Sequence, residues 1–489
     1  MNRSLDLNRG LLAVEGPNLQ SGLRRAIIAA IAARRLQPGQ QMPPSRVLAA
    51  QLGIARNTVT AVYEDLATRG FLVSITRRGF FVTGQVADAA DDEAAAGEDA
   101  HAGAPDWPRR MAVRVSEWRH ITKPADWQSY RFPFIYGQVD PEFFPLAAWR
   151  SASRDALGRA AVNWWAADNT DEDDPLLIEQ IRRQILPRRG ILARPNEVLI
   201  TLGSQEGLYL LSRLLVRAGD VVGIENPGYT DARHIFSLSA GEVRDLPVDG
   251  DGVRTGPDFE GVSLAVVTPS RHCPTGVPLS AERRAWLLDW ASRSDGLLIE
   301  DDYEGEMVAA NSLTALKASD SAGRVIYLGT FSKIIAPGMR LGYMVGPAPL
   351  IAEARALRRL MHRSPPLNNQ RLTALFMVEG YYQGLVRQLR SELLRRHERA
   401  SACLAQRLPG LETSGGHGGS SIWVRCPAGV NGEALAAGAR ARGVLFENGG
   451  PFFSTPPEDL HIRLGLSAIA AERIGPGVEA LADALDEAL

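Results

Sequence analysis

Long apolar runs and cysteines are both scarce in this sequence. No apolar run in Met1–Val14 is long enough for a signal peptide, and no later segment is long and apolar enough to span a membrane. The three cysteines, Cys273, Cys403 and Cys426, are odd in number and far apart, so a disulfide framework is not expected. These absences argue against a disulfide-rich secreted protein and a membrane protein, and they predict a cytoplasmic protein with reduced thiols.

Basic residues are absent from residues 84–106, which carry seven acidic residues and a net charge of −7. The preceding residues 19–83 have the opposite balance, with nine arginines against two acidic residues and a net charge of +7. The formal net charge of the whole chain is only −2, so the total hides this asymmetry. A compact basic segment followed by an acidic one predicts a polyanionic partner for the basic segment.

The chain of 489 residues is too long for one ordinary core, and its composition predicts three parts. Residues 15–83 are predicted to form a small domain. Residues 84–128 are predicted to be a flexible acidic linker, because a segment rich in Ala, Gly and acidic residues cannot bury enough surface to offset its ordering entropy. Residues 129–489 form the third and largest part.

Apolar runs alternate with helical stretches in this third part. The alternation predicts an α/β domain with parallel strands, followed at about 365–489 by a smaller α+β subdomain. The predicted strands are Val198–Thr201, Val221–Ile224, Leu264–Thr268, Leu297–Glu300 and Val325–Leu328, and helices such as 205–217 and 280–293 separate them.

The basic segment is predicted to be an α+β winged helix-turn-helix domain. Its periodicity predicts helices over Leu19–Arg35, from Ser45 as N-cap to about Gln51, and over about Asn57–Arg69, and two apolar runs, Phe71–Ile75 and Phe80–Thr83, predict a hairpin. In such domains the third helix enters the major groove of double-stranded DNA. The residues predicted to bind DNA are Arg56, Asn57 and Thr58 on this helix, Arg46 on the helix before it, and Arg77 and Arg78 in the hairpin. The alternative is that the arginines only solvate a small helical domain, but their placement at a helix N-terminus and a turn favours DNA binding.

Motifs in this segment resemble the GntR class of bacterial DNA-binding domains. They are Leu36-x-Pro-Gly-x-x-Met-Pro-Pro-Ser-Arg, Leu48-Ala-x-x-Leu-Gly, Arg56-Asn-Thr-Val, Tyr63-x-x-Leu and Gly70-Phe-Leu. The resemblance implies that the domain binds an operator in double-stranded DNA.

The predicted buried strand Val325–Leu328 is followed closely by Ser332-Lys333, and Arg340 comes seven residues after the lysine. A lysine at the C-terminal end of a strand can form a Schiff base with an aldehyde cofactor, and a hydroxyl and a guanidinium beside it suit a phosphate. This combination predicts a site for pyridoxal 5'-phosphate (PLP). No metal site is predicted.

Three further segments follow predicted strands and support this site. Ser204-Gln205 opens a helix whose N–H groups suit a phosphate, and Tyr229 suits stacking on the pyridine ring. Asp301 suits the ring N–H, and Tyr303 suits the phenolic oxygen. Taken singly, each segment has an ordinary alternative: a packing turn, a core tyrosine or a helix cap. Their combination with Lys333 favours the cofactor site.

From about residue 130 to residue 489, these parts and their order resemble fold-type I PLP enzymes of the aminotransferase kind. The resemblance implies that Lys333 forms the internal aldimine and that Asp301 binds the ring nitrogen. It also implies that the phosphate contacts Ser204, Gln205, Ser332 and Arg340. In Leu460-His-Ile-Arg463-Leu-Gly-Leu-Ser467, it implies that Arg463 binds a ligand carboxylate in bidentate fashion.

The sequence departs from the enzyme pattern in two places. Cys273 replaces the asparagine that precedes Pro-Thr-Gly, which puts transamination in doubt, and Asn163-Trp-Trp-Ala-Ala-Asp168 replaces Tyr-Gly-Asp-Pro-x-Gly, which puts in doubt a phosphate contact from the neighbouring subunit. A ligand role for Arg271 and His272 stays open as an alternative.

A GntR-like head joined by a linker to an aminotransferase-like body resembles the MocR/GabR subfamily of bacterial transcription regulators. The resemblance implies a PLP-dependent, DNA-binding transcription regulator and a head-to-tail homodimer formed through the body. We hypothesise that an amino compound displaces Lys333 as an external aldimine and shifts the body between two states. PLP alone as the effector is a variant of this hypothesis.

Two alternatives remain: an aminotransferase that carries a DNA-binding domain, and a degenerate body that serves only for dimerisation. We expect a sensor rather than an enzyme, with partial transamination half-reactions left open.

Overall fold

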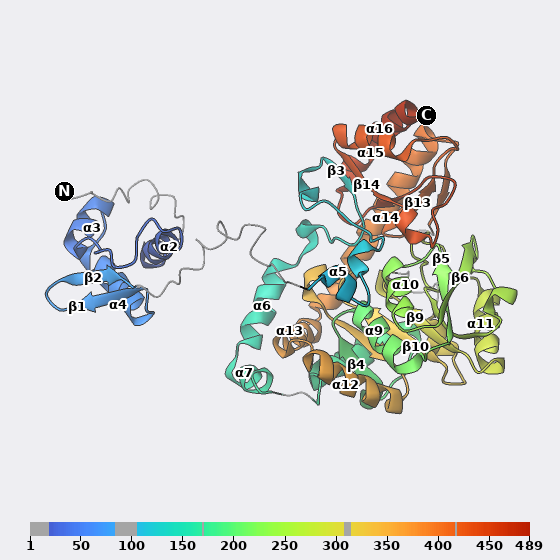
Figure 1. Cartoon of the computed structure of the whole chain (residues 1–489), viewed down its shortest axis with the longest axis horizontal. Helices are drawn as coiled ribbons and strands as arrows, with labels where there is room; N and C mark the ends of the chain where they lie inside the picture. Colours follow the sequence, from blue (N-terminus) through green and yellow to red (C-terminus); the bar gives the residue numbers. More distant parts are fainter. Residues whose placement is uncertain (1–18, 84–104, 169–170, 308–313, 416–417) are drawn as a thin grey trace. The chain divides into compact units, whose positions relative to one another are not determined.

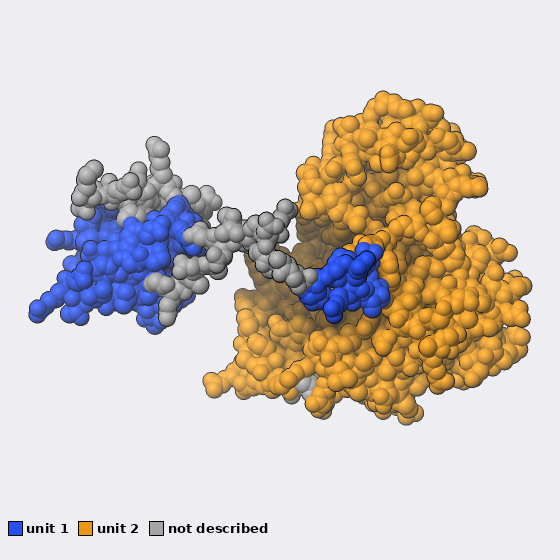
Figure 2. Space-filling view, viewed as in Figure 1, with its two compact units in different colours: residues 1–115 blue, residues 116–489 orange. Residues whose placement is uncertain are grey.

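The computed structural model describes residues 19–83, 105–168, 171–307, 314–415 and 418–489. The chain divides into two compact units, which are coloured separately in Figure 2. The boundary along the sequence lies between Val115 and Ser116. We call the winged domain of residues 19–83 the head and residues 116–489 the body. Among the helices of the described residues, none is both long enough and apolar enough to cross a membrane.

The head has three helices and a hairpin, as the sequence predicts (Figure 1). The elements are α2 (Leu19–Ala32), α3 (Ser45–Leu52), α4 (Arg56–Thr68), β1 (Leu72–Ile75) and β2 (Gly79–Val82). Apolar residues three or four positions apart on the helices meet in one core, which includes Leu23 and Ile27 of α2, Leu48 of α3, and Val59 and Leu66 of α4. The strands pair antiparallel, from Leu72 opposite Val82 to Ile75 opposite Gly79.

The start of α3 differs from the prediction. Pro44, not Ser45, is the N-cap, and the cap makes no side-chain hydrogen bond. Ser45 is the first helical residue, and its Oγ instead accepts a hydrogen bond from Arg56 Nε at 3.5 Å. The helix ends at Gly53, whose left-handed φ of 66° favours glycine and lets its N–H reach Ala49 O.

The body contains an eight-stranded sheet of order β4-β11-β10-β9-β8-β5-β6-β7. Strands β10, β9, β8, β5 and β6 are mutually parallel, whereas β11 runs antiparallel to β10 and β4, and β7 runs antiparallel to β6. The strands are β4 (Val198–Thr201), β5 (Val221–Asn226), β6 (Glu242–Asp249), β7 (Gly252–Val253), β8 (Val262–Val267), β9 (Leu297–Asp301), β10 (Val325–Thr330) and β11 (Gly342–Val345). The five strands predicted from apolar runs are confirmed, with ends that differ by two residues at most.

Helices pack against this sheet and form the rest of the large subdomain. They are α6 (Leu146–Ala156), α7 (Arg159–Trp165), α8 (Pro175–Gln180), α9 (Ser204–Leu215), α10 (Thr230–Ser237), α11 (Ala281–Arg293), α12 (Ala348–His362) and α13 (Leu367–Val378). The central strands are buried on both faces, which explains why they read as continuous apolar runs.

A buried ion-pair cluster lies beside the edge strand β4. The buried Asp173 carboxylate accepts hydrogen bonds from Arg355 at 2.6 Å and from the buried Arg358 at 2.8 Å.

The smaller subdomain has a five-stranded sheet of order β12-β13-β15-β14-β3. Its elements are β3 (Phe132–Phe134), α14 (Tyr381–Arg407), β12 (Glu412–Ser414), β13 (Ser421–Arg425), α15 (Gly432–Ala441), β14 (Val444–Asn448), β15 (His461–Gly465) and α16 (Ala471–Ala488). Strand β3 comes from the start of the body and pairs parallel with β14, and Figure 1 shows it among the C-terminal elements.

The boundary of this subdomain differs from the predicted start near residue 365. Helix α13 packs into the large core through Ala374, Phe376 and Met377. Helix α14 belongs to both subdomains, because Leu389 lies in the large core and Leu404 in the small one. The subdomain boundary could not be placed from the sequence, because the helical periodicity of α13 and α14 does not indicate which of the two cores each helix packs into.

Part of the predicted linker packs against the body. Arg119 Nη2 donates to Phe453 O at 3.1 Å and to Ser454 O at 2.6 Å, and the ring of Trp118 lies 4.9 Å from that of His234. Two short helices, α5 (Trp107–Arg110) and a 3-10 turn at Val115–Glu117, precede these contacts. The stretch 105–128 is therefore partly structured, while residues 84–104 lie outside the described part of the chain.

Candidate functional site

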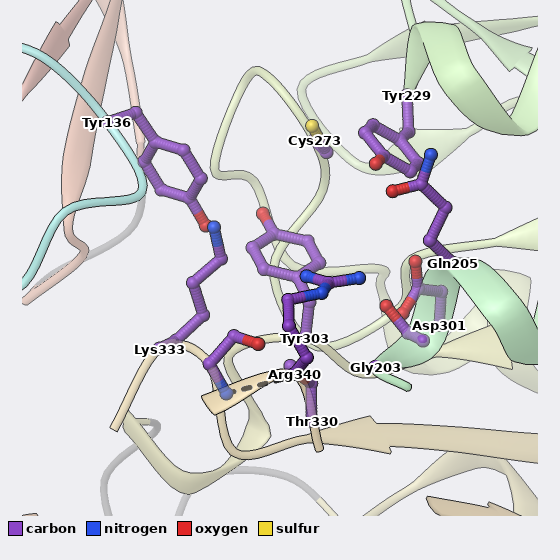
Figure 3. A pocket seen from close by; sticks show the side chains of 12 residues that line it. Tyr136, Gly203, Gln205, Tyr229, Cys273, Asp301, Tyr303, Thr330, Lys333 and Arg340 are labelled. Carbon is purple, nitrogen blue, oxygen red and sulfur yellow. Dashed lines mark hydrogen bonds between the residues drawn. The ribbon is translucent and has the colours of Figure 1, made fainter. Parts of the chain in front are cut away.

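One cavity of the body lies where the strands of the large sheet end. Its volume is about 130 Å³, and Figure 3 shows its lining. Apart from Tyr136, which follows β3 of the smaller sheet, the lining comes from the C-terminal ends of β4, β5, β8, β9 and β10 and the loops after them, which is the edge where sheets with parallel strands usually bind ligands. The lining residues are Tyr136, Gly203, Ser204, Gln205, Tyr229, Cys273, Asp301, Tyr303, Thr330, Ser332, Lys333 and Arg340. The eight residues predicted to bind the cofactor are all in this set.

Lys333 lies in the turn after β10. The turn is held by Phe331 N, which donates to Leu341 O at 3.0 Å, and by Ser332 N, which donates to Thr330 Oγ1 at 3.2 Å. The lysine Nζ lies 4.2 Å from the centre of the Tyr136 ring. Burial lowers the pKa of Lys333 to about 8, although Glu304 acts in the opposite direction. About a tenth of this amine is therefore neutral, and nucleophilic, at pH 7, far more than for an unperturbed lysine.

Asp301 ends β9 and is buried in the cavity wall. Its Oδ1 is buried without a hydrogen-bond partner among the described residues. Burial raises the pKa of Asp301 to about 7, partly offset by a hydrogen bond from Ser204. An unpaired buried carboxylate oxygen is costly, and a cationic N–H donor placed beside it would remove that cost.

Four residues form a cradle for an anion. Ser332 Oγ is buried and has no hydrogen-bond partner among the residues that the structure describes. Arg340 Nη2 donates to Leu202 O at 2.7 Å, which holds the guanidinium against the start of α9. A side chain at Gly203 would place its Cβ 3.3 Å from Arg340 Nη2, and the φ of 88° there also favours glycine. Ser204 then opens α9, so N–H groups, a hydroxyl and a guanidinium converge.

Three further predicted residues line the cavity in other roles. The hydroxyl of Tyr229 donates to Asp231 Oδ2 at 3.2 Å, and Gln205 Nε2 donates to the same oxygen at 3.3 Å. The Asp231 carboxylate therefore holds both side chains at the cavity edge, and Figure 3 shows Tyr229 and Gln205 beside each other there. The ring of Tyr303 lies edge-on to that of Tyr136, with 6.3 Å between their centres. Burial raises the pKa of both phenols well above the usual range.

The donor set fits PLP. The unpartnered Asp301 Oδ1 suits a pyridinium N–H, and the unpartnered Ser332 Oγ suits a phosphate oxygen beside Arg340. Lys333 supplies an amine in the same cavity. A buried carboxylate oxygen is thus available for the charged ring nitrogen of this cofactor, and a buried hydroxyl is available for its phosphate.

Arg463 is the one predicted ligand residue that does not line the cavity. It is buried on β15, where its Nε and Nη2 each lie 2.7 Å from Glu447 Oε2. Its remaining nitrogen, Nη1, lies 3.8 Å from Cys273 Sγ. The guanidinium therefore sits directly behind a lining residue and already has a carboxylate partner.

The departures from the enzyme pattern have visible structural consequences. Cys273 lines the cavity, and burial raises the pKa of its thiol to about 11, so it is neutral. Arg271 and His272 do not line it: Arg271 Nε lies 3.5 Å from Glu304, and His272 Nδ1 is 2.7 Å from Thr275 Oγ1. In the segment 163–168, which stands where the enzymes have Tyr-Gly-Asp-Pro-x-Gly, Trp165 Nε1 donates a hydrogen bond to Ala156 O at 2.8 Å. This contact joins α7 to the end of α6.

Sequence reasoning assigned no role to Tyr136, Thr330 or Glu447. Tyr136 reaches the cavity because β3 joins a sheet whose other strands lie about 300 residues later in the chain. The apolar run Phe132–Ile135 is a local signal for a strand, but it does not identify the strand's neighbour. Thr330 lies two residues after the predicted strand Val325–Leu328 and close before Ser332-Lys333, so its position in the sequence could have pointed to it.

On the head, the residues predicted to bind DNA lie on the surface. Arg56 and Asn57 are exposed at the N-terminus of α4, Arg46 is exposed on α3, and Thr58 is partly buried. Arg77 and Arg78 are exposed in the turn between β1 and β2. Two other arginines of this segment have an internal partner: Arg24 and Arg69 lie 2.9 and 3.0 Å from the Asp65 carboxylate. The DNA contacts of individual residues stay predictions.

Comparisons with known proteins match both parts of the chain. Residues 170–481 match the family model for aminotransferase class I and II, and residues 19–82 match that for bacterial regulatory proteins of the gntR family. The chain is 42% identical to the HTH-type transcriptional regulator TauR of Rhodobacter capsulatus, with 96% of each chain covered. It is 29% identical to the probable rhizopine catabolism regulatory protein MocR of Rhizobium meliloti, covering 93% of this chain and 91% of MocR.

Among solved structures, the body resembles a kynurenine aminotransferase of Pyrococcus horikoshii that was solved in complex with PMP. The TM-score is 0.70 at 26% identity, and the match covers 78% of this chain and 98% of the enzyme. The predicted α/β aminotransferase-like fold is confirmed, and so is the GntR-type domain ahead of it.

Proposed function

This chain belongs to the MocR/GabR subfamily of GntR-type transcription regulators, and we propose that its aminotransferase-like body senses a small amino compound through bound PLP. The observation that carries the proposal is a pair of buried oxygens, Asp301 Oδ1 and Ser332 Oγ, which have no hydrogen-bond partner among the described residues and lie in the cavity that also holds Lys333. Both cost free energy unless a ligand satisfies them.

Each residue has a defined part in this proposal. Ser332, Arg340 and the start of α9 hold the phosphate, and Asp301 holds the ring nitrogen. When bound, PLP supplies an aldehyde carbon that reacts reversibly with primary amines. Lys333 contributes an amine whose lowered pKa of about 8 makes a far larger fraction of it neutral near pH 7 than in an ordinary lysine. The half-buried side chains of Tyr229 and Tyr303 line the cavity and would limit which ligands fit beside the ring.

Regulation follows from linkage. An effector can change DNA binding only if its affinity differs between two arrangements of the protein. Lys333 Nζ lies 4.2 Å from the centre of the Tyr136 ring, which follows β3 of the smaller subdomain, so a ligand amine that competed with Lys333 would change a contact with that subdomain. We therefore propose that the effector signal passes from Lys333 to the smaller subdomain. PLP acting alone as effector is the variant of this proposal.

Assembly and location are part of the same proposal. We propose a homodimer formed by the body, in which α12 contributes an exposed apolar pair, Leu360 and Met361, with 84% and 45% of their surface accessible. Operator binding by two heads would follow from such a dimer and would place the protein in the bacterial cytoplasm. Sedimentation equilibrium of the full chain tests the dimer, and the variant L360E should weaken it.

The test uses the full chain loaded with PLP and DNA fragments selected from genomic DNA by the protein itself. The wild type should be yellow, and primary amines should change both its visible absorbance and its affinity for the selected DNA. The variant K333A should lose the absorbance band and the amine response but keep DNA binding. A K333A protein that regulates normally would support a body used only for dimerisation.

An aminotransferase with a DNA-binding domain is the second candidate. It is favoured by the complete set of Lys333, Asp301 and Arg340 around one cavity. Multiple turnovers with an amino donor and a keto-acid acceptor would support the enzyme, whereas a stable spectral change without turnover would support the sensor. Cys273, in the place of the enzymes' asparagine, favours the sensor.

A further inference from the structure

The strongest unexplained contact near the cavity is the ion pair between Arg463 and Glu447. The two residues are directly opposite each other on the antiparallel strands β15 and β14. Arg463 Nε and Nη2 both lie 2.7 Å from Glu447 Oε2. Only 3% of Arg463 and 5% of Glu447 is exposed, so neither charge is screened by water.

The rest of the guanidinium is also enclosed. Its carbon lies 4.1 Å from the centre of the Tyr136 ring and 4.6 Å from that of Phe452. Glu447 is held from its other oxygen as well, since Oε1 accepts a hydrogen bond from Tyr136 N at 3.3 Å. Tyr136 and Cys273 line the cavity, so the pair lies immediately behind its wall.

We propose that Glu447 takes the place of a ligand carboxylate at Arg463, so that the cavity selects amines with no carboxylate at this position. This inference rests on the proposed function, because it specifies the ligand class of the same site. A ligand carboxylate can bind the Nε–Nη2 edge of Arg463 only by displacing Glu447, and the remaining nitrogen, Nη1, lies behind Cys273. The displaced carboxylate would stay buried, and the Tyr136 N–H is the remaining hydrogen-bond donor to it among the described residues, which is unfavourable. Arg463 therefore serves a ligand carboxylate only when the carboxylate at position 447 is absent.

The test compares two probes that differ by one carboxylate, ethylamine and L-alanine, on the PLP-loaded full chain. Visible absorbance and titration calorimetry report binding. The wild type should bind L-alanine no more tightly than ethylamine. The variant E447Q should shift the relative affinity toward L-alanine by about tenfold or more, as expected for a freed buried charge. E447D keeps the negative charge and should retain the wild-type preference.

A matched control and a second readout separate the outcomes. E487Q removes a glutamate from an exposed ion pair with Arg442 and should leave the preference unchanged. Without added PLP, acetate should raise the melting temperature of E447Q more than that of the wild type, and R463M in the E447Q background should abolish this gain. These acetate measurements need no cofactor.

The results decide the proposals separately. A wild type that prefers L-alanine, or an E447Q variant that gains neither L-alanine affinity nor acetate stabilisation while its circular dichroism is native, overturns the role of Glu447. A wild type that never becomes yellow overturns the proposed cofactor function instead, and the acetate measurements still decide whether Glu447 blocks Arg463.

Discussion

The reactivity of Lys333 should have a pH dependence that an ordinary lysine lacks. Burial lowers the pKa of Lys333 from 10.5 to about 8. At about pH 7.5, roughly a quarter of the Lys333 amine is then neutral, compared with about one part in a thousand for an unperturbed lysine. The fraction able to attack an aldehyde is therefore about two hundredfold larger.

The assay is the rate at which PLP-free protein becomes yellow after PLP is added, measured as a function of pH. The rate should rise with pH, reach half of its maximum near pH 8 and level off about one pH unit higher, where most of Lys333 has lost its proton. Free N-acetyl-lysine methyl ester, mixed with PLP in the same buffers, corrects for changes in the cofactor itself. Its rate should continue to rise through the range in which the protein's rate is already flat.

A second variant tests the cause of the shift. Glu304 raises the pKa of Lys333 and so opposes the effect of burial. E304Q should therefore move the midpoint of the rate–pH curve to lower pH. K333A should not become yellow in this assay at all. A wild-type midpoint near that of free lysine, or an E304Q midpoint moved to higher pH, would refute the account of how burial and Glu304 set the reactivity.

The remaining predictions concern the cofactor, the core and the DNA. Asp301→Asn should weaken PLP binding by about tenfold or more, measured by equilibrium dialysis, because the ring nitrogen loses its charged partner. Arg340→Met should weaken PLP binding but leave the binding of pyridoxal, which has no phosphate, nearly unchanged. Asp173→Ala should destabilise the body by about 3–5 kcal/mol in urea unfolding, because it leaves the buried Arg358 without its carboxylate. Arg56→Ala should weaken DNA binding and reduce the slope of log K against log salt concentration by about one unit, while the yellow absorbance stays intact. Loss of both DNA binding and absorbance would show that head and body do not act as separate units.

Much of the cofactor site could be predicted because its residues stand at strand ends. In a parallel sheet all C-terminal ends meet at one edge, so local patterns that place Ser204, Tyr229, Asp301 and Lys333 just after strands also bring them together. The head was predictable for a similar reason, since its helices and hairpin follow from periodicity over 65 residues. The N-cap of α3 shows the limit of this reasoning. Ser45 is predicted to be the N-cap, but Pro44 already has the extended backbone conformation of a cap, so the helix starts at Ser45.

The two folds, the order of the parts and the chemistry of the lysine follow from local patterns in the sequence. Which groups face one another across strands depends on how the chain pairs those strands. Tyr136 enters the cavity wall because β3 pairs with β14, and Glu447 meets Arg463 because β14 and β15 pair in one register. Such pairings join residues far apart in the chain, and a shift of one residue would have placed Glu447 on the other face of the sheet. Whether Arg463 is open to a ligand therefore depends on strand register, which no local pattern in the sequence contains.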